Sequence, residues 1–182
     1  MKISSVTFIV AILAPFTGAV DIINHTDANC GGSSITYRNI GPNSCAPGLF
    51  TIGGRPRGTR ATRIIGLPGN GRLNLWNADR SRGTCGAFKS SLVRFGNNFC
   101  GNSATEYAGS SWGVAAAKRQ VRRSEAEECT STATPDILTL AEGQEYELGG
   151  LAPEKVEELV ALVIDGTKAE DLPDEFAQLQ SN

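Results

Sequence analysis

The sequence predicts a mainly β protein: a duplicated Greek-key-like β-sandwich stabilised by disulfides, followed by a short acidic tail with one or two α-helices. Three observations support this fold class. Four of the five cysteines fall into two equally spaced pairs, glycines separate short runs of alternating hydrophobicity, and helix signals occur only near the C-terminus. A chain of 182 residues with 40% hydrophobic residues is long enough for one domain with an appended segment.

The cysteine pairs mark an internal repeat. The segments 30–45 and 85–100 align without a gap, as CGGSSITYRNIGPNSC and CGAFKSSLVRFGNNFC, and the sequence DIIN at 21–24 resembles NLWN at 74–77. A unit of about fifty-five residues therefore occurs twice. Two such units favour two sheets packed face to face, because each sheet needs a partner to cover its apolar face.

The strands follow from short alternating or β-branched runs bounded by Gly, Pro and Asn. They are expected near 20–25, 34–39, 49–52, 62–66, 72–77, 91–95 and 111–116. The many glycines between them supply the positive φ that tight turns require.

Equal spacing favours one bridge within each unit, Cys30–Cys45 and Cys85–Cys100. Four cysteines nevertheless allow three pairings. Each such bridge would stabilise the fold by about 3 kcal/mol in the chain-entropy model. The odd cysteine, Cys129, is either free and buried, paired with another chain, or a sign that the other four are paired differently.

The N-terminal segment indicates secretion. Lys2 precedes the apolar stretch 6–16, and the small residues 17–19 follow, so we expect a signal peptide at 1–19 with cleavage after Ala19. The apolar run is too short to span a membrane. An exported, extracellular protein is expected to hold its cysteines as disulfides rather than as a metal site. In that setting the sequon at Asn24 is a candidate glycosylation site.

Charge divides along the chain. Residues 20–123 contain 14 basic and 4 acidic residues, a net of +10, whereas residues 124–182 contain 2 basic and 15 acidic residues, a net of −13. We therefore expect a cysteine-containing sandwich at 20–117, a dibasic linker at 118–134 and an acidic, partly helical tail at 135–182.

The tail has strand signals at 137–140 and 146–148 and a helix signal from Pro153 to about Ile164. Pro153 suits the first helical turn and Gly166 suits the C-terminal cap. A second short helix is expected to begin at Pro173. The first helix carries an apolar face at i, i+3, i+4 and i+7, formed by Val156, Leu159, Val160 and Val163. This face must pack on something, and the basic core is its expected partner.

Several motifs resemble small cysteine-rich secreted proteins of filamentous fungi, many of which are candidate effectors or toxins. They are the signal peptide, Cys-Gly-x-Ser-Ser at 30–34, Asn-x-Cys at 43–45, the Ile-Gly-Leu-Pro turn at 65–68 and Ser-Ser-Trp at 110–112. The duplicated unit is also similar to βγ-crystallin-like and killer-toxin-like proteins. The aromatic corner residue of crystallin motifs is replaced by Ile23, and their calcium-binding stretch is not recognisable, so calcium binding is not expected.

Two dibasic pairs lie where the charge reverses. They are Lys118-Arg119 and Arg122-Arg123. In a fungal secretory pathway such pairs resemble the sites cut by the kexin-type processing protease. The alternative is a solvated basic linker.

A group of arginines spaced by Gly and Pro is the main candidate binding feature, formed by Arg55, Arg57, Arg60, Arg63 and Arg72. Such a basic segment suits an anionic polysaccharide, an anionic membrane surface or an acidic host protein. The alternatives are a solvated loop or a docking surface for the protein's own acidic tail. No specific nucleic acid, cofactor or metal is predicted.

The composition argues against catalysis. With one His, the core hardly provides the two positioned proton-transfer groups that RNA cleavage requires, and no Gly-x-Ser-x-Gly elbow is present. The first hypothesis is a non-enzymatic, effector-like or toxin-like interaction protein, whose basic segment binds an anionic target and whose acidic tail masks that segment until the dibasic junction is cut. The alternative is a small secreted hydrolase, acting on cell wall or RNA, that uses His25 and Glu106.

Overall fold

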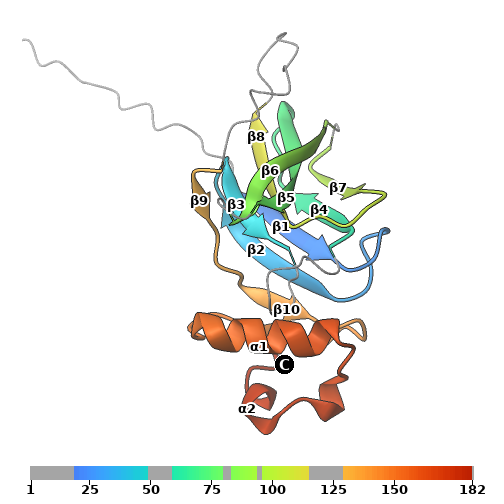
Figure 1. Ribbon diagram of the computed structural model, residues 1–182, viewed down its shortest axis with the longest axis vertical. Coiled ribbons are helices and arrows are strands. Elements are labelled where there is room, and N and C mark those ends of the chain that lie inside the picture. Colours follow the sequence, from blue (N-terminus) through green and yellow to red (C-terminus); the bar gives the residue numbers. More distant parts are fainter. Residues whose placement is uncertain (1–18, 49–58, 80–82, 94–95, 115–128, 182) are drawn as a thin grey trace, which may run out of the picture.

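A computed structural model describes residues 19–48, 59–79, 83–93, 96–114 and 129–181 of the chain. Two β-sheets pack face to face, and the C-terminal helices lie at one end of this sandwich (Figure 1). The mainly β fold with two sheets, two disulfides and a short helical C-terminal region is confirmed. The expected signal peptide lies outside the described residues, apart from Ala19.

The six-stranded sheet has the order β11-β10-β2-β1-β4-β7, and the five-stranded sheet has the order β6-β5-β8-β3-β9. The first sheet consists of β11 (Glu145–Glu147), β10 (Ile137–Thr139), β2 (Ser34–Ile40), β1 (Val20–His25), β4 (Ala61–Ile65) and β7 (Asn98–Asn102). The second consists of β6 (Gly83–Leu92), β5 (Gly71–Asp79), β8 (Gly109–Val114), β3 (Ser44–Pro47) and β9 (Ser131–Thr132).

The sequence repeat is visible in the topology. The order β2-β1-β4-β7 in one sheet matches β6-β5-β8-β3 in the other, and every pair in these two sets is antiparallel. The equivalent strands are β1 and β5, β2 and β6, β3 and β7, and β4 and β8. Each unit therefore gives its third strand, β3 or β7, to the sheet of the other unit. This exchange joins the two units through backbone hydrogen bonds as well as through their apolar faces.

The predicted set of strands needs correction at three places. β6 begins at Gly83 rather than near 91. Most of its residues are half-buried, so its sequence lacks the alternation of apolar and polar residues that marks a strand. β3 and β7 were missed, because a four-residue strand ending in Pro47 and the polar sequence NFCGN have weak β-propensity. The strand expected at 49–52 lies outside the described residues.

The core lies between the two sheets. Ile22 and Ile64 come from the six-stranded sheet, and Leu73, Leu75 and Trp112 come from the five-stranded sheet; each is at most 2% exposed. Alternation along each strand places these side chains inward and their neighbours outward.

The C-terminal segment is part of the same fold. β10 extends the six-stranded sheet beyond β2, and β9 pairs in parallel with β3 at the edge of the other sheet. The helix α1 spans Pro153–Ile164, as predicted, and is followed by the short 3₁₀ helix η1 (Ala169–Asp171) and by α2 (Asp174–Ala177). No helix among the described residues is long and apolar enough to cross a membrane.

α1 presents its expected apolar face to the rest of the molecule. Leu159, Val160 and Val163 are buried in one hydrophobic cluster that also contains Ile35 of β2 and Leu138 of β10. The tail therefore packs on the core through apolar burial and strand pairing.

Candidate functional site

The structure describes three of the five arginines of the predicted anion site, and these three differ in exposure. Arg55 and Arg57 lie outside the described residues. Arg60 is exposed immediately before β4, and Arg63 is half-buried on the outward face of β4. Arg72 is only 8% exposed on β5, which corrects its assignment to the anion-binding set, because a large external ligand cannot reach a buried guanidinium.

His25 ends β1 and is 8% exposed. Burial, together with the positive charge of Arg63, lowers the pKa of His25 from 6.5 to about 4. The imidazole is therefore neutral at physiological pH. Glu106 is exposed between β7 and β8, and among the described residues no hydrogen bond or ion pair joins it to His25. This arrangement adds nothing in favour of the hydrolase alternative.

Lys89, a basic residue within the second copy of the repeat, has a structural role. Its ammonium group donates hydrogen bonds to the carbonyl and the hydroxyl of Thr105 and to the carbonyl of Glu106, at 2.7–2.8 Å. It also lies over the ring of Tyr107, 5.7 Å from the centroid. Lys89 therefore fixes the loop between β7 and β8.

The disulfides join the two units instead of closing each one. Cys30 is bonded to Cys100 and Cys45 to Cys85, so the pairing expected from the equal spacing is wrong. The physical reason is the exchange of β3 and β7. Each of these strands carries the second cysteine of its unit into the sheet of the other unit, where it meets that unit's first cysteine.

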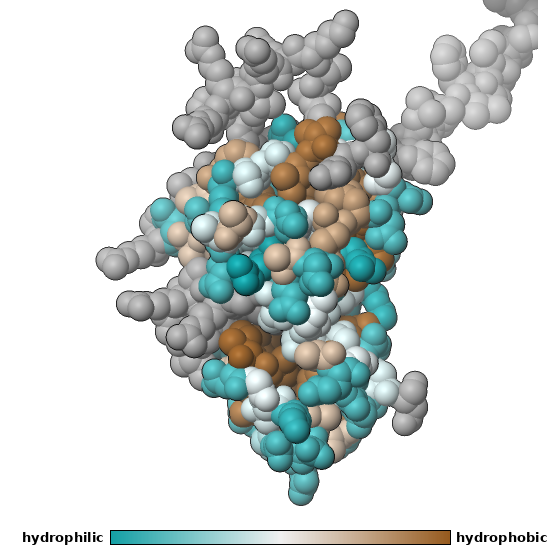
Figure 2. Space-filling view, turned by 90° about the vertical axis from the view of Figure 1, so that its right-hand side faces the viewer, coloured by the Kyte–Doolittle hydropathy of each residue, from teal (hydrophilic) through white to brown (hydrophobic). Residues whose placement is uncertain are grey.

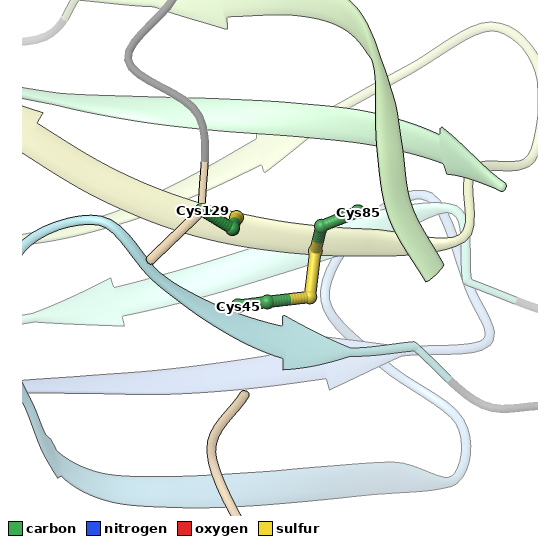
Figure 3. Close-up of side chains that lie close together, drawn as sticks. All are labelled: Cys45, Cys85 and Cys129. Carbon is green, nitrogen blue, oxygen red and sulfur yellow. A yellow bond between two sulfur atoms is a disulfide. The ribbon is translucent and has the colours of Figure 1, made fainter. Parts of the chain in front are cut away.

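Cys129 lies beside one of the two bridges. Its thiol is free and half-buried, and the sulfur atoms of Cys45, Cys85 and Cys129 all lie within 4.8 Å of one another (Figure 3). Burial raises the pKa of the Cys129 thiol, and a hydrogen bond with Ser111 partly offsets that rise. We call these three residues the sulfur cluster. The sequence does not predict it, because Cys129 lies outside the repeat.

Asn24 is fully buried between the sheets, and this excludes a glycan there in the folded protein. Its amide nitrogen donates to the carbonyls of Ala46 and Pro47, at 3.2 and 3.0 Å. Its amide oxygen accepts hydrogen bonds from the hydroxyls of Thr62 and Ser110, at 2.6 and 2.8 Å. All four hydrogen-bonding positions of the carboxamide are therefore occupied. The glycosylation expected at this sequon is corrected accordingly.

A pocket of about 330 Å³ lies between the sandwich and the C-terminal segment. It is bordered by Ile35 and Tyr37 of β2, by Val156 and Val160 of α1, and by residues 132–135. Figure 2 shows another view of the junction, where apolar residues gather in a hollow between the sandwich and the C-terminal segment. The described residues that line the pocket include no cluster of charged or nucleophilic side chains.

Comparison with known proteins places the chain in a family. A family model described as the N-terminal domain of ARB_05566 matches residues 21–136, and one described as the C-terminal domain matches residues 141–182. The chain belongs to the ARB_05566 family. β10 lies between the two matches, and the domain boundaries expected from the sequence stay predictions.

The chain is similar to an uncharacterized secreted protein of Arthroderma benhamiae. It is 30% identical over 175 residues, which cover 92% of this chain and 88% of the relative. The expected secreted localisation and the similarity to secreted fungal proteins are thereby confirmed. No solved structure matches the chain, so the similarity to βγ-crystallin-like and killer-toxin-like proteins stays a prediction.

Proposed function

We propose that this protein is a non-enzymatic, effector-like or toxin-like secreted interaction protein that binds an anionic target through Arg55, Arg57, Arg60 and Arg63. The target is a cell-wall polysaccharide, a membrane surface or another anionic host component. The observation that carries the proposal is the segregation of charge, +10 over residues 20–123 against −13 over residues 124–182. A basic surface of this kind attracts polyanions and concentrates them near the protein.

The arrangement of the acidic segment supports this view. Its ion pairs among the described residues are internal, namely Lys155–Glu158, Lys155–Glu175 and Lys168–Glu170. Glu145, Glu147, Glu154, Glu157 and Glu158 are exposed on β11 and α1. The negative charge therefore acts on residues 20–123 through its long-range field, which reduces the attraction of this part of the chain to a polyanion.

Masking by the acidic tail does not end when the dibasic junction is cut. β9 and β10 are paired with β3 and β2, and the apolar face of α1 is buried, so a cut at Lys118–Arg123 would leave the tail in place. Unmasking then requires both the cut at the dibasic junction and the undocking of the tail.

Binding to heparin, used as a sulfated polysaccharide probe, tests the proposal. The triple variant Arg55→Ala, Arg57→Ala, Arg60→Ala should bind about tenfold more weakly at low salt, and the difference should shrink near 0.5 M NaCl, where charges are screened. The matched control is Arg80→Ala, Arg82→Ala, Arg94→Ala, which removes the same charge elsewhere in residues 20–123.

The control should retain most of the binding. Equal losses in both triple variants would show that net charge alone is responsible and would contradict a defined site. Vesicles containing anionic lipid, measured in parallel, distinguish a membrane surface from a polysaccharide. Binding to neither probe would overturn the proposal for these two target classes and leave an acidic host protein.

A further inference from the structure

The two disulfides are equivalent in the repeat, but only one has a third sulfur beside it. Cys30–Cys100 and Cys45–Cys85 each join the first cysteine of one unit to the second cysteine of the other, and each spans 6.0 Å between Cα atoms. The chain has five cysteines, and the remaining one, Cys129, lies within 4.8 Å of both sulfurs of the second bridge (Figure 3). Cys30–Cys100 thus provides an internal control for the chemistry of Cys45–Cys85.

Backbone and side-chain contacts hold the Cys129 segment against β3. The amide of Thr130 donates to the carbonyl of Asn43 at 2.8 Å, and the amide of Ala133 donates to the carbonyl of Cys45 at 2.7 Å. The hydroxyls of Ser44 and Ser131 are 2.8 Å apart. Because these contacts involve Cys45 itself and the two residues before it, they hold the segment that follows Cys129 against β3 and keep the free thiol close to the bridge.

The opposite side of the bridge depends on a glycine. A Cβ atom at Gly109 of β8 would lie 2.8 Å from the sulfur of Cys85 and 3.1 Å from the carbonyl oxygen of Ala46. Such a Cβ would overlap the sulfur. The absence of a side chain at Gly109 therefore allows the bridge to lie directly on the sheet, within reach of Cys129.

We propose that the sulfur cluster is a thiol–disulfide exchange site, in which Cys129 replaces Cys85 as the partner of Cys45. The Cys129 thiol loses its proton to solvent, and its thiolate attacks the sulfur of Cys45. The Cys45–Cys129 bond forms as the Cys45–Cys85 bond breaks, and Cys85 leaves as a thiolate that takes up a proton. The number of disulfides is unchanged, so no oxidant or reductant is consumed.

Burial decides which sulfur leaves. Cys85 is half-exposed at the start of the outer strand β6, whereas Cys45 is 2% exposed. A thiolate released at Cys85 reaches water, but one released at Cys45 would be a buried charge without a charged partner. The pairing of β9 with β3 also keeps Cys129 next to the strand of Cys45.

Exchange is slow near neutral pH because the reactive species is the thiolate. Burial raises the pKa of Cys129, and the hydrogen bond with Ser111 opposes that rise only in part. Among the described residues, no charged side chain contributes to this shift. The native Cys45–Cys85 bridge therefore persists after folding, and the exchanged form accumulates over a longer time.

Exchange changes which parts of the chain are covalently linked. The Cys45–Cys85 bridge joins two strands of the repeat. A Cys45–Cys129 bridge would instead join β3 to the C-terminal segment, which follows residues 115–128 in the chain. A tail attached in this way stays bound after a cut at Lys118–Arg123. This consequence rests on the proposed processing, but the exchange itself does not.

Peptide mapping of the full-length secreted protein tests the exchange directly. The five cysteines fall on five different tryptic peptides, those ending at Arg38, Arg57, Lys89, Lys118 and Lys155. The protein is incubated at pH 8.5 without oxidant, quenched with acid, alkylated with N-ethylmaleimide and digested. We expect the label to move from the Cys129 peptide to the Cys85 peptide, while a Cys45–Cys129 link appears and Cys30–Cys100 stays intact.

Label that remains on Cys129 at all times would overturn the proposal. A Cys85–Cys129 link would overturn the assignment of Cys85 as the leaving group. In the control variant Cys129→Ser, both native bridges should persist and Cys85 should stay unlabelled.

The variant Cys85→Ser provides a second test that does not depend on exchange rates. Oxidised with glutathione disulfide, it should form a Cys45–Cys129 bridge, and an intact Cys30–Cys100 link reports that the variant has folded. Free thiols at both Cys45 and Cys129 in the folded variant would contradict the proposed geometry. None of these readouts requires anion binding or junction cleavage, so their failure is distinguishable from failure of the proposed function.

Discussion

At the scale of the residue, the polar side chains around Asn24 form a buried, hydrogen-bonded network between the sheets. The hydroxyl of Thr62 donates to Asn24, so the 2.6 Å contact between Thr62 and Tyr107 is one in which the phenol donates to Thr62. Tyr37 donates to the carbonyl of Pro47 at 2.7 Å, which adds another link between the two sheets. Because the side chains of Asn24, Thr62, Tyr107 and Tyr37 all have partners, this network fixes how the sheets are placed against each other.

Replacement of Asn24 by Ala tests this network at the residue scale. The change leaves two carbonyls and two hydroxyls without their buried partner, so we expect the free energy of unfolding to fall by about 3 kcal/mol. Urea unfolding measured by Trp fluorescence gives this value. Asn77→Ala is the matched control, because Asn77 occupies the corresponding position in the second repeat and is exposed.

The control should change the free energy of unfolding by less than about 0.5 kcal/mol. If the two variants were equally stable, the carboxamide of Asn24 would not connect the sheets as described. A glycan found on Asn24 in the folded, secreted protein would contradict the same arrangement.

At the scale of the element, the exchange of β3 and β7 between the units determines the disulfide pairing, which the sequence repeat alone does not. Two identical spacings favour two identical local bridges, but β3 and β7 pair with the opposite unit and carry Cys45 and Cys100 with them. The helix α1 behaves differently, since its ends are determined locally by Pro153 at its start and by Gly166, with φ of +84°, beyond its end. Local signals therefore predicted the helix, whereas non-local pairing decided the disulfides.

Two leucines on α1 allow a matched test of the packing of the helix. Leu159 is 0% exposed and Leu162 is half-buried, although both lie in the same helix. Leu159→Ala should lower the free energy of unfolding by about 3 kcal/mol, because it leaves a cavity in the core. Leu162→Ala should cost about 1 kcal/mol. Equal effects in urea unfolding would show that α1 does not pack through this face.

At the scale of the whole molecule, the acidic segment makes the two units of the repeat unequal, because it covers strand edges of the first unit only. β10 covers the edge of β2 and β9 covers the edge of β3, whereas the equivalent strands of the second unit, β6 and β7, are the outermost strands of their sheets. Covering an edge reduces unwanted pairing with other chains. The segment of charge −13 is thus joined to a unit of charge +10 mainly by backbone pairing and apolar burial.

Cutting the chain at the junction tests this joining. A specific protease site is inserted after Arg123 in a Cys129→Ser background, which excludes a covalent link between the fragments. We expect the two fragments to elute together in size-exclusion chromatography at both low salt and about 0.5 M NaCl, because apolar contacts are not screened by salt. Urea should separate them. Separation by salt alone would show that charge attraction holds the tail.

The sequence by itself determined the mainly β class, the duplicated unit, the first two strands and the C-terminal helix, because each depends on patterns within one short segment. It also indicated secretion. The tertiary structure decided the disulfide pairing, the burial of Asn24 and Arg72 and the placement of Cys129 beside Cys45. These features depend on contacts between segments far apart in the chain. The spacing of residues along one segment carries no information about which distant strand will lie beside it.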